Sequence, residues 1–302
     1  MRRLLLPLVS LLALLIAVPA CATPPTPMLW KVSKGDSTVY LLGSMHMLKD
    51  GDYPLSADVE SAYKDAERLV FEISPEEMNS PATAAIMLQR GMFHDGKTLQ
   101  SVLSPQTWNM LQAYGDKNGL PAAKLQPLEP WFVSIMLVLV ESQKLGLDPT
   151  SGLDMHFMTE SRTDHKSSQG LETAAQQFEM LAGGSMKVQE DELRQGLDEM
   201  ADFPKKMGEE YNAWRRGDAD SIVAQTKQEF AKYPELYQQL LAQRNRAWIP
   251  KIEQLFNGKH DTLVVVGAAH LPGPDGVVKL LQAKGYKVER ICTGPGCAFA
   301  KH

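Results

Sequence analysis

The hydrophobic pattern of the chain contains several short apolar runs that predict strands. Two of these runs end in the same pattern: residues 38–42 are followed by Gly-Ser-Met-His46, and residues 262–266 are followed by Gly-Ala-Ala-His270. β-branched and aliphatic residues favour buried strands, and a glycine at the strand end permits the backbone to turn. We therefore expect both histidines just beyond strand ends, where α/β sheets bind their ligands. If the two strands belong to one sheet, the imidazoles share one site.

The other periodicities predict the rest of an α/β core. Further strands are expected at residues 69–73, 166–171 and 287–291, with helices between them. Residues 188–256 are charged, amphipathic and almost free of strand signals, so we expect a large helical insertion that covers one side of the core. The predicted fold is α/β, with a central mixed sheet that carries the two Gly-x-x-His motifs on its N- and C-terminal strands. Helices are predicted at residues 54–66, 151–162, 173–181 and 274–284, and after the Ser-Pro pairs 80–81 and 104–105 and Pro130.

Residues 1–20 have the layout of a secretory signal peptide. Two arginines precede an apolar run that ends in small residues, and this run is shorter than the roughly 20 residues of a membrane-spanning helix. We therefore expect an exported protein of the periplasm or cell envelope. Cleavage before Thr23 and attachment of a membrane-anchoring lipid to Cys21 are alternative ways of processing it. Residues 21–28 are then a tether, and residues 29–302 form a single domain.

Charge and cysteine content narrow the classes of function. The formal net charge is −5, and loss of the signal peptide with its two arginines changes it to −7. Nothing basic is left to attract a nucleic acid, so nucleic acids are excluded as partners. Cys292 and Cys297 flank a Gly-Pro-Gly turn, which in an exported protein predicts a local disulfide bond.

Glu72 adds a carboxylate to the two histidines, because it lies near the end of the predicted strand at residues 69–73. Two histidines and one glutamate are a common ligand set for a divalent metal ion. The alternative is that Glu72 caps the next helix or pairs with a lysine. The methionines of the chain read as core residues, although they leave room for a haem-binding slot.

Several short motifs, taken in chain order, resemble the TraB/GumN family and cover nearly all of the mature chain. They are Leu-Trp-Lys-Val at 29–32, Leu-Leu-Gly-Ser-Met-His at 41–46, Val-Phe-Glu-Ile at 70–73, Gly-Leu-Asp at 152–154, Gly-Leu-Glu-Thr at 170–173 with Gln176, Arg-Asn at 244–245, and Val-Gly-Ala-Ala-His-Leu at 266–271. That family is similar to the Tiki proteins, which are metal-dependent proteases of secreted signalling proteins. It is more distantly similar to erythromycin esterases and the ChaN haem-binding lipoproteins.

The resemblance implies that His46, Glu72 and His270 hold a divalent metal ion, with manganese, cobalt, zinc and iron as candidates. Such an ion lowers the pKa of a bound water molecule and so supplies a nucleophile. The expected function is therefore that of an exported metal-dependent hydrolase that cleaves amide bonds of a peptide or protein. The alternative is a non-catalytic periplasmic protein that binds a peptide or haem.

The resemblance also implies three catalytic residues. Glu172 would be a second carboxylate, acting as a base or a further ligand, and Arg244 would stabilise an anionic intermediate. Asn245 would lie beside this arginine. The alternative for Glu172 and Arg244 is a buried ion pair between them.

Overall fold

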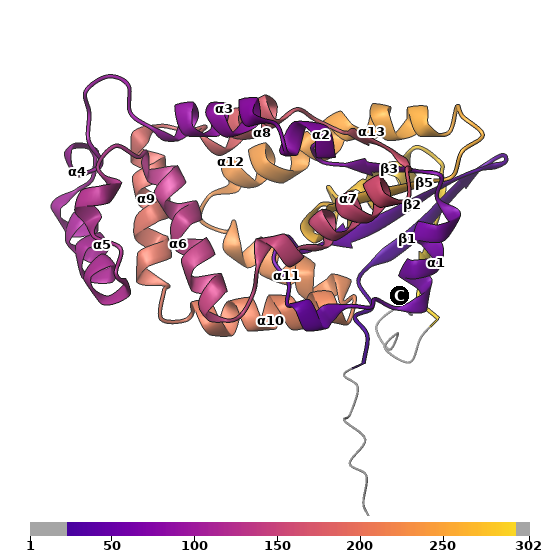
Figure 1. Cartoon of the computed structure of the whole chain (residues 1–302), viewed down its shortest axis with the longest axis horizontal. Helices are drawn as coiled ribbons and strands as arrows, with labels where there is room; N and C mark the ends of the chain where they lie inside the picture. The colour runs from indigo at the N-terminus through magenta and orange to yellow at the C-terminus, as the bar shows by residue number, and fades with distance from the viewer. Residues whose placement is uncertain (1–22, 294–302) are drawn as a thin grey trace, which may run out of the picture.

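One mixed sheet of six strands lies toward one end of the molecule's long axis, and helices extend away from it toward the other end (Figure 1). The computed structural model describes residues 23–293. The strand order across the sheet is β4-β3-β5-β2-β1-β6. The strands are β1 (Leu29–Lys34), β2 (Ser37–Ser44), β3 (Arg68–Phe71), β4 (Ser167–Gly170), β5 (Thr262–Gly267) and β6 (Lys287–Ile291). The prediction of an α/β fold with a mixed sheet is confirmed.

The two strands that precede the histidine motifs are direct neighbours in this sheet. β2 pairs with β5 in parallel, and the register places Ser44 opposite Gly267. β3 pairs in parallel with β5 on its other side, and β4 pairs in parallel with β3. Carboxyl ends of parallel strands meet at one edge of a sheet. The residues that follow β2, β3, β4 and β5 therefore come to the same edge.

Helices fill the connections between the strands. Ser80 and Ser104 cap α3 and α5 with a proline in the first turn, as the Ser-Pro pairs predicted. The helices are α1 (Ala57–Asp65), α2 (Pro75–Met78), α3 (Pro81–Gly91), α4 (Leu99–Val102), α5 (Pro105–Asn118), α6 (Pro130–Lys144), α7 (Leu153–Thr163), α8 (Ala174–Leu181), α9 (Met186–Asp198), α10 (Phe203–Arg215), α11 (Ala219–Glu229), α12 (Pro234–Tyr237), α13 (Gln243–Leu255) and α14 (Val277–Ala283).

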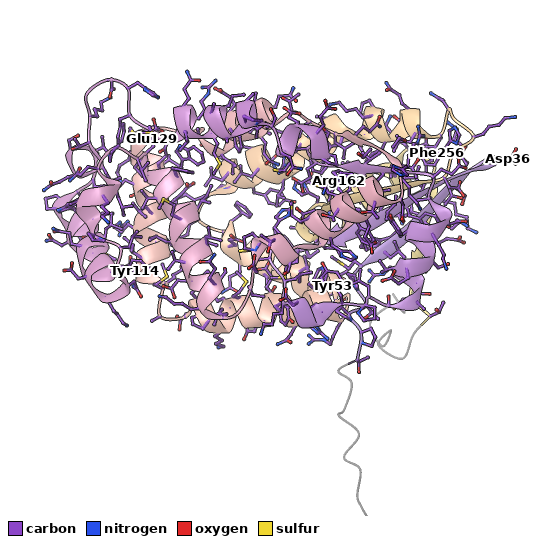
Figure 2. All side chains as sticks on the ribbon, viewed as in Figure 1. Asp36, Tyr53, Tyr114, Glu129, Arg162 and Phe256 are labelled. Atoms are coloured by element: carbon purple, nitrogen blue, oxygen red, sulfur yellow. The ribbon has the colours of Figure 1, made fainter. Side chains whose placement is uncertain are left out.

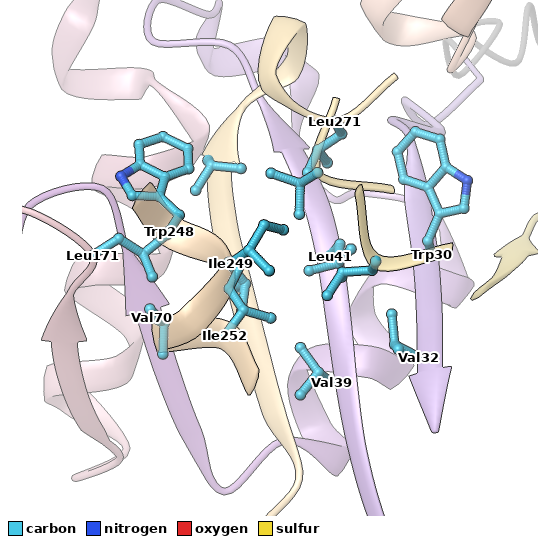
Figure 3. Close-up of a cluster of buried hydrophobic side chains, with 14 of the residues drawn as sticks. Trp30, Val32, Val39, Leu41, Val70, Leu171, Trp248, Ile249, Ile252 and Leu271 are labelled. Carbon is cyan, nitrogen blue, oxygen red and sulfur yellow. The ribbon is translucent and has the colours of Figure 1, made fainter. Parts of the chain in front are cut away.

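One face of the sheet packs against α13. Trp248, Ile249 and Ile252 of this helix belong to one buried cluster with Leu41 of β2 and Val70 of β3 (Figure 3). Burial of side chains of this size stabilises the fold by about 1.5–3 kcal/mol each. The packing fixes α13, and with it the residues at its start, against the parallel strands.

The opposite face of the sheet packs against α1 and α7. Val59 of α1 and Phe157 of α7 share a second buried cluster with Leu69 of β3 and Val265 of β5. Tyr63 of α1 stacks on Phe157, with 5.1 Å between the ring centroids. The sheet is therefore the middle layer of three.

The helices far from the sheet have a core of their own. Leu111 of α5, Leu137 of α6 and Leu193 of α9 belong to a separate cluster of buried side chains. We call α4, α5, α6 and α9 the helical lobe; in Figure 1 these helices lie at the end opposite the sheet.

Residues 188–256 are mostly helical, as expected, but they do not form one insertion on one side of the core. Their first helix, α9, joins the helical lobe, whereas their last helix, α13, packs on the sheet. The rest of the lobe comes from the connection between β3 and β4. The apolar face of α13 explains the difference, since Trp248 and Ile252 are buried only when the helix lies on the strands.

β1 is a strand that the apolar pattern did not predict. Lys31 interrupts its apolar residues, and Lys34 ends it. It pairs antiparallel with β2 on one side and with β6 on the other. The motif strands are consequently the second and fifth strands along the chain, and they lie inside the sheet, where neighbours cover both of their edges.

Part of the predicted tether packs into the fold. Residues 25–28 are buried, and the Thr26 amide donates a hydrogen bond to the Arg215 carbonyl oxygen at 2.8 Å. Arg215 lies at the end of α10, and its side chain forms an ion pair with the buried Asp52. The packed part of the chain therefore begins before the predicted boundary at residue 29.

Several sequence predictions concern residues outside the described range. The signal peptide at residues 1–20, the lipid on Cys21 and the cysteine partner Cys297 all lie there, so these stay predictions. Within residues 23–293, no helix has the length and apolar character that crossing a bilayer requires.

Replacement of Ile252 by alanine tests the packing of α13 on the sheet. Ile252 is fully buried, so Ile252→Ala should lower the free energy of unfolding by about 2–5 kcal/mol through lost contacts and a cavity. The control is Leu88→Ala in α3, which is 53% exposed and should change stability by no more than about 0.5 kcal/mol. Urea unfolding followed by circular dichroism measures both. Equal losses in the two variants would contradict the packing.

Candidate active site

Three side chains predicted to bind a metal surround one glycine at the edge of the sheet. Gly267 ends β5, and a Cβ atom built on it would lie 3.2 Å from Glu72 Oε1, 3.4 Å from His270 Cδ2 and 3.6 Å from His46 Nε2. His46 follows β2, Glu72 follows β3 and His270 follows β5. The structure therefore brings these three residues together.

The Glu72 carboxylate is held by partners on both of its oxygens. Oε1 accepts a hydrogen bond from the Gly267 amide at 2.8 Å. Oε2 accepts hydrogen bonds from Gln177 at 3.0 Å and from Arg244 at 2.5 Å. Burial alone would raise the pKa of Glu72, but the neighbouring His270 and Arg244 lower it to about 2. Glu72 is therefore ionised at neutral pH. Its contacts are with Gly267, Gln177 and Arg244, and they do not match the alternative roles of helix cap or lysine partner.

His46 is oriented by a carboxylate on α7. Its Nδ1 lies 3.1 Å from Asp154 Oδ1, and the Ser44 hydroxyl donates to the same oxygen at 2.9 Å. The Asp154 carboxylate raises the pKa of His46 to about 9. Gly152 lets α7 come this close, because a Cβ there would lie 2.2 Å from the His46 carbonyl oxygen. The imidazole therefore turns its Nε2 toward Gly267.

His270 is oriented by an amide on α13. Its Nδ1 lies 2.6 Å from Asn245 Oδ1, while Asn245 Nδ2 donates to the Asp275 carbonyl oxygen at 2.9 Å. The second hydrogen bond fixes which atom of the amide is the oxygen, so Nδ1 of His270 carries the proton. Burial lowers the pKa of His270 to about 3. His270 is therefore neutral, with an unprotonated Nε2.

Arg244 lies between these groups and uses every arm of its guanidinium. Nη2 donates to Glu72 at 2.5 Å and to Glu172 at 2.5 Å, and Nη1 lies 3.1 Å from His270 Nε2. Nη1 also donates to the Leu240 carbonyl oxygen at 3.0 Å. Leu240 lies in a π-helical turn, Gln238–Ala242, that joins α12 to α13. Such turns often occur at functional sites because they alter the direction of the side chains that follow.

The Glu172 carboxylate is saturated with donors. Oε1 accepts hydrogen bonds from Arg244 and from Gln177 at 3.1 Å. Oε2 accepts hydrogen bonds from the Trp248 indole at 3.1 Å and from Arg244 Nε at 3.2 Å. This arrangement is the buried ion pair that was the alternative reading of Glu172 and Arg244. Because no acceptor position is left open, Glu172 positions Arg244 and is poorly placed to accept a proton from water.

The donor chemistry of the site fits a divalent metal ion. Histidines that bind metals hold their second ring nitrogen through a carboxylate or carbonyl oxygen, and Asp154 and Asn245 do this for His46 and His270. Both Nε2 atoms and the Glu72 carboxylate then face the same space. Within residues 23–293, however, no group of three or more His, Cys, Asp or Glu is arranged as a metal site. The contact between Arg244 and His270 Nε2 would have to open for an ion to bind there.

Three adjoining cavities meet at His46. The smallest has a volume of about 240 Å³ and contains Glu72, Arg244 and His270 together with His46. The other two, of about 590 and 510 Å³, also include His46 in their linings and have mostly apolar walls. The His46 side chain is 61% exposed, whereas the His270 side chain is 5% exposed. A ligand therefore reaches the site from the side of His46.

Two residues of the site had no role assigned from the sequence. Asp154 belongs to the Gly-Leu-Asp motif, which supported the family resemblance but did not indicate what the aspartate does. No motif or pattern in the sequence pointed to Gln177. Gln177 bridges Glu72 and Glu172 through its side-chain nitrogen. Among the residues that were assigned, Asn245 contacts His270 and does not face the space between the histidines.

The opposite environments of the two histidines predict opposite titrations. In metal-free protein we expect His46 to be an imidazolium at neutral pH with a pKa near 9, and His270 to stay neutral down to a pKa near 3. Because the pKa of His46 is raised on folding, its pair with Asp154 stabilises the fold below about pH 6.5, and this contribution is lost as the pH rises through 9. Nitrogen-15 NMR of the imidazoles with EDTA present measures both values.

Asp154→Asn should return the pKa of His46 toward the ordinary histidine value, because it removes the charge that raises it. Asp164→Asn, at the other end of α7, is the control, since Asp164 contacts Tyr63 and not the site. A His46 pKa that is unchanged in Asp154→Asn would contradict the assignment.

Comparison with known proteins agrees with the motifs. The profile of the TraB/PrgY/gumN family matches residues 28–290. The uncharacterized protein YbaP of Escherichia coli (strain K12) is 24% identical over 251 residues, which cover 82% of this chain and 89% of YbaP. An uncharacterized protein of Treponema pallidum (strain Nichols) is 22% identical over 285 residues, which cover 89% of this chain and 84% of that protein. No solved structure matches the chain. Because the family profile covers most of the sequence, this chain belongs to the TraB/PrgY/gumN family.

Proposed function

We propose that the protein is a metal-dependent hydrolase that cleaves amide bonds in an exported peptide or protein substrate. One observation carries the proposal. The imidazoles of His46 and His270 are both held at Nδ1 by an oxygen from outside the site, and their Nε2 atoms share a cavity with an ionised carboxylate, Glu72. This is the arrangement by which proteins present two nitrogens and one oxygen to a divalent cation.

His46, His270 and Glu72 would hold the ion, which when bound supplies Lewis acidity and an activated water molecule. Manganese, cobalt, zinc and iron all accept these ligands. Gly267 keeps the space between the ligands free of a side chain. The open side of His46 faces the two larger cavities, so the substrate amide would approach from there.

Arg244 would stabilise negative charge that develops on the amide oxygen during attack, through the Nη1 donor that it would release from His270 when an ion binds there. A cation helps most when it is fixed before the reaction, since no reorganisation is then needed. Glu172 and Trp248 provide this fixation, because Glu172 binds two arms of the guanidinium and Trp248 binds Glu172. Glu172 is accordingly proposed as a positioning residue, in place of the base expected from the resemblance.

The contact between Arg244 and His270 favours a second candidate, a peptide-binding protein without turnover. In that case Arg244 keeps its contact with His270 Nε2, at the position where an ion would otherwise bind. Export to the periplasm, by simple cleavage or with a lipid on Cys21, is part of both proposals. The haem version of the binding protein has no supporting contact in the site.

Metal content separates the two candidates. The purified wild-type protein should carry about one divalent ion per chain, measured by elemental mass spectrometry, and His46→Ala with His270→Ala should abolish binding because two ligands are lost. The control is His260→Ala, since the His260 side chain is 59% exposed, pairs with Glu67 and lies outside the cavities that meet at His46. No metal in the wild type after dialysis against each candidate ion would reject the hydrolase.

The role of Arg244 is tested by Arg244→Lys in metal-loaded protein. Lysine keeps the charge but cannot reproduce the fork that binds both glutamates, so hydrolysis of a peptide library should slow by about 100-fold or more in kcat. Arg246→Lys, in the same helix but with an exposed side chain, should leave the rate unchanged. Peptide products are measured by mass spectrometry, and equal rates in the two variants would remove Arg244 from the mechanism.

A further inference from the structure

The larger cavity beside His46 combines apolar walls with carboxyl groups. Its volume is about 590 Å³. Its apolar lining includes Trp131, Ile135 and Val138 of α6, together with Phe230 and Leu240 from later in the chain. Ile135 and Val138 are among the large apolar side chains that remain exposed, at 36% and 40%. Exposed apolar surface inside a cavity favours a ligand with aliphatic or aromatic parts.

One face of α9 lines the acidic side of this cavity. Glu192, Gln195 and Glu199 follow helical spacing, and Glu229 at the end of α11 completes the lining. Glu199 already has partners, because it accepts from Lys206 at 2.6 Å and from the Gln195 side-chain nitrogen at 3.0 Å. Among the described residues, Glu192 and Glu229 have no such ion pair or hydrogen bond.

Two acceptor atoms of this lining are buried without a partner. They are Glu192 Oε1 and Gln195 Oε1, which make no hydrogen bond in the structure. An unsatisfied buried acceptor destabilises the free protein, and a donor from a ligand recovers that loss. The lining of the cavity therefore presents two acceptor atoms that no donor of the described residues satisfies.

The surroundings of the two free carboxyl groups oppose their ionisation. Burial raises the pKa of Glu192 to about 7. Burial, followed by the neighbouring carboxylate of Glu210, raises the pKa of Glu229 to about 7, and Lys206 opposes this rise. The Glu229 side chain nevertheless stays in contact with the water of the cavity. A cation bound beside either group would favour its ionised form, and beside Glu229 it would also offset the charge of Glu210.

Building on the proposed peptide hydrolase, we propose that this cavity binds a lysine or arginine side chain of the substrate peptide. The methylene stem lies on the apolar wall of α6, and the cationic head binds Glu192 and Glu229. Lysine and arginine side chains can bury their methylene stems on apolar surface while the charged head group stays accessible to an ion-pair partner. The enzyme thereby selects peptides with a basic residue on this side of the cleaved bond.

The cavity on the other side of His46 lacks the same chemistry. It has a volume of about 510 Å³, and its walls include Met78, Met87 and Met155. Its carboxyl groups are Glu72 and Asp154, which are engaged with Arg244 and His46. We therefore expect selection for a cation on one side only, with an apolar side chain on the other.

The test measures peptide binding apart from hydrolysis. Three pools of fluorescein-labelled hexapeptides carry lysine, norleucine or glutamate at one fixed central position, and random residues elsewhere. Norleucine keeps the stem and lacks the charge. Fluorescence anisotropy with the wild-type protein should show binding of the lysine pool about fivefold tighter than the norleucine pool, as expected for one partly solvated ion pair. The glutamate pool should bind most weakly.

Variants then locate the preference. Glu192→Gln and Glu229→Gln should each reduce the ratio of the lysine and norleucine affinities, whereas Glu209→Gln, an exposed residue of α10 outside the cavity, should leave it unchanged. Circular dichroism confirms that each variant is folded. Equal affinities of the lysine and norleucine pools for the wild type, an unchanged ratio in both cavity variants, or no binding of any pool at about 1 mM peptide would overturn the proposal.

A parallel measurement on His270→Ala separates this proposal from the proposed hydrolase. His270 lies outside the lining of the cavity, so the lysine preference should persist in this variant even if hydrolysis is absent. If the lysine preference persists and the metal-loaded wild type also cleaves no peptide, the hydrolase is rejected and the cavity assignment stands. Cleavage by the wild type without a lysine preference would reject only the cavity assignment.

Discussion

The parallel pairing of β2 with β5 is the constraint on which the site depends. Two segments more than 200 residues apart along the chain become neighbours through this pairing, with Ser44 opposite Gly267. A shift of register by one residue would turn each side chain to the other face of the sheet. Both strands are buried on both faces, so such a shift would misplace side chains in both of the layers packed on the sheet.

The second constraint is that the negative charges buried at the site need a cation, and Arg244 provides it. Two carboxylates, Glu72 and Glu172, are buried within reach of its guanidinium. Two carboxylates buried this close together repel each other, and a cation between them offsets that repulsion. The arginine thus permits an anionic centre beside the neutral His270. Arg244 belongs to α13. Because α13 packs on the sheet through its apolar side chains, the hydrophobic core also fixes the position of this charge.

Much of the arrangement around the histidines could be predicted from the sequence, because it depends on local signals. Apolar runs that end in glycine located His46 and His270, and the same reasoning placed Glu72 after its strand. What could not be predicted depends on contacts between distant segments. The role of Asp154 requires α7 to approach β2, and the saturation of Glu172 requires the indole of Trp248. Neither contact leaves a periodic pattern in the sequence.

The same limit applies to the fold. The Ser-Pro pairs predicted the starts of two helices because capping depends on neighbouring residues. The apolar pattern did not predict β1 because Lys31 interrupts its apolar residues. The division of residues 188–256 between the helical lobe and the sheet was equally hidden. Amphipathic helices show which face is apolar, but not which partner will cover that face.

The order in which the site's parts occur along the chain has a consequence for biogenesis. His46 and Glu72 belong to the first quarter of the sequence, whereas Arg244 and His270 belong to its last fifth. β2 can pair with β5 only after β5 has been synthesised. The complete site therefore cannot form on the growing chain until synthesis of the chain is almost finished. An unfinished chain accordingly carries His46 and Glu72 without the groups that complete the site around them.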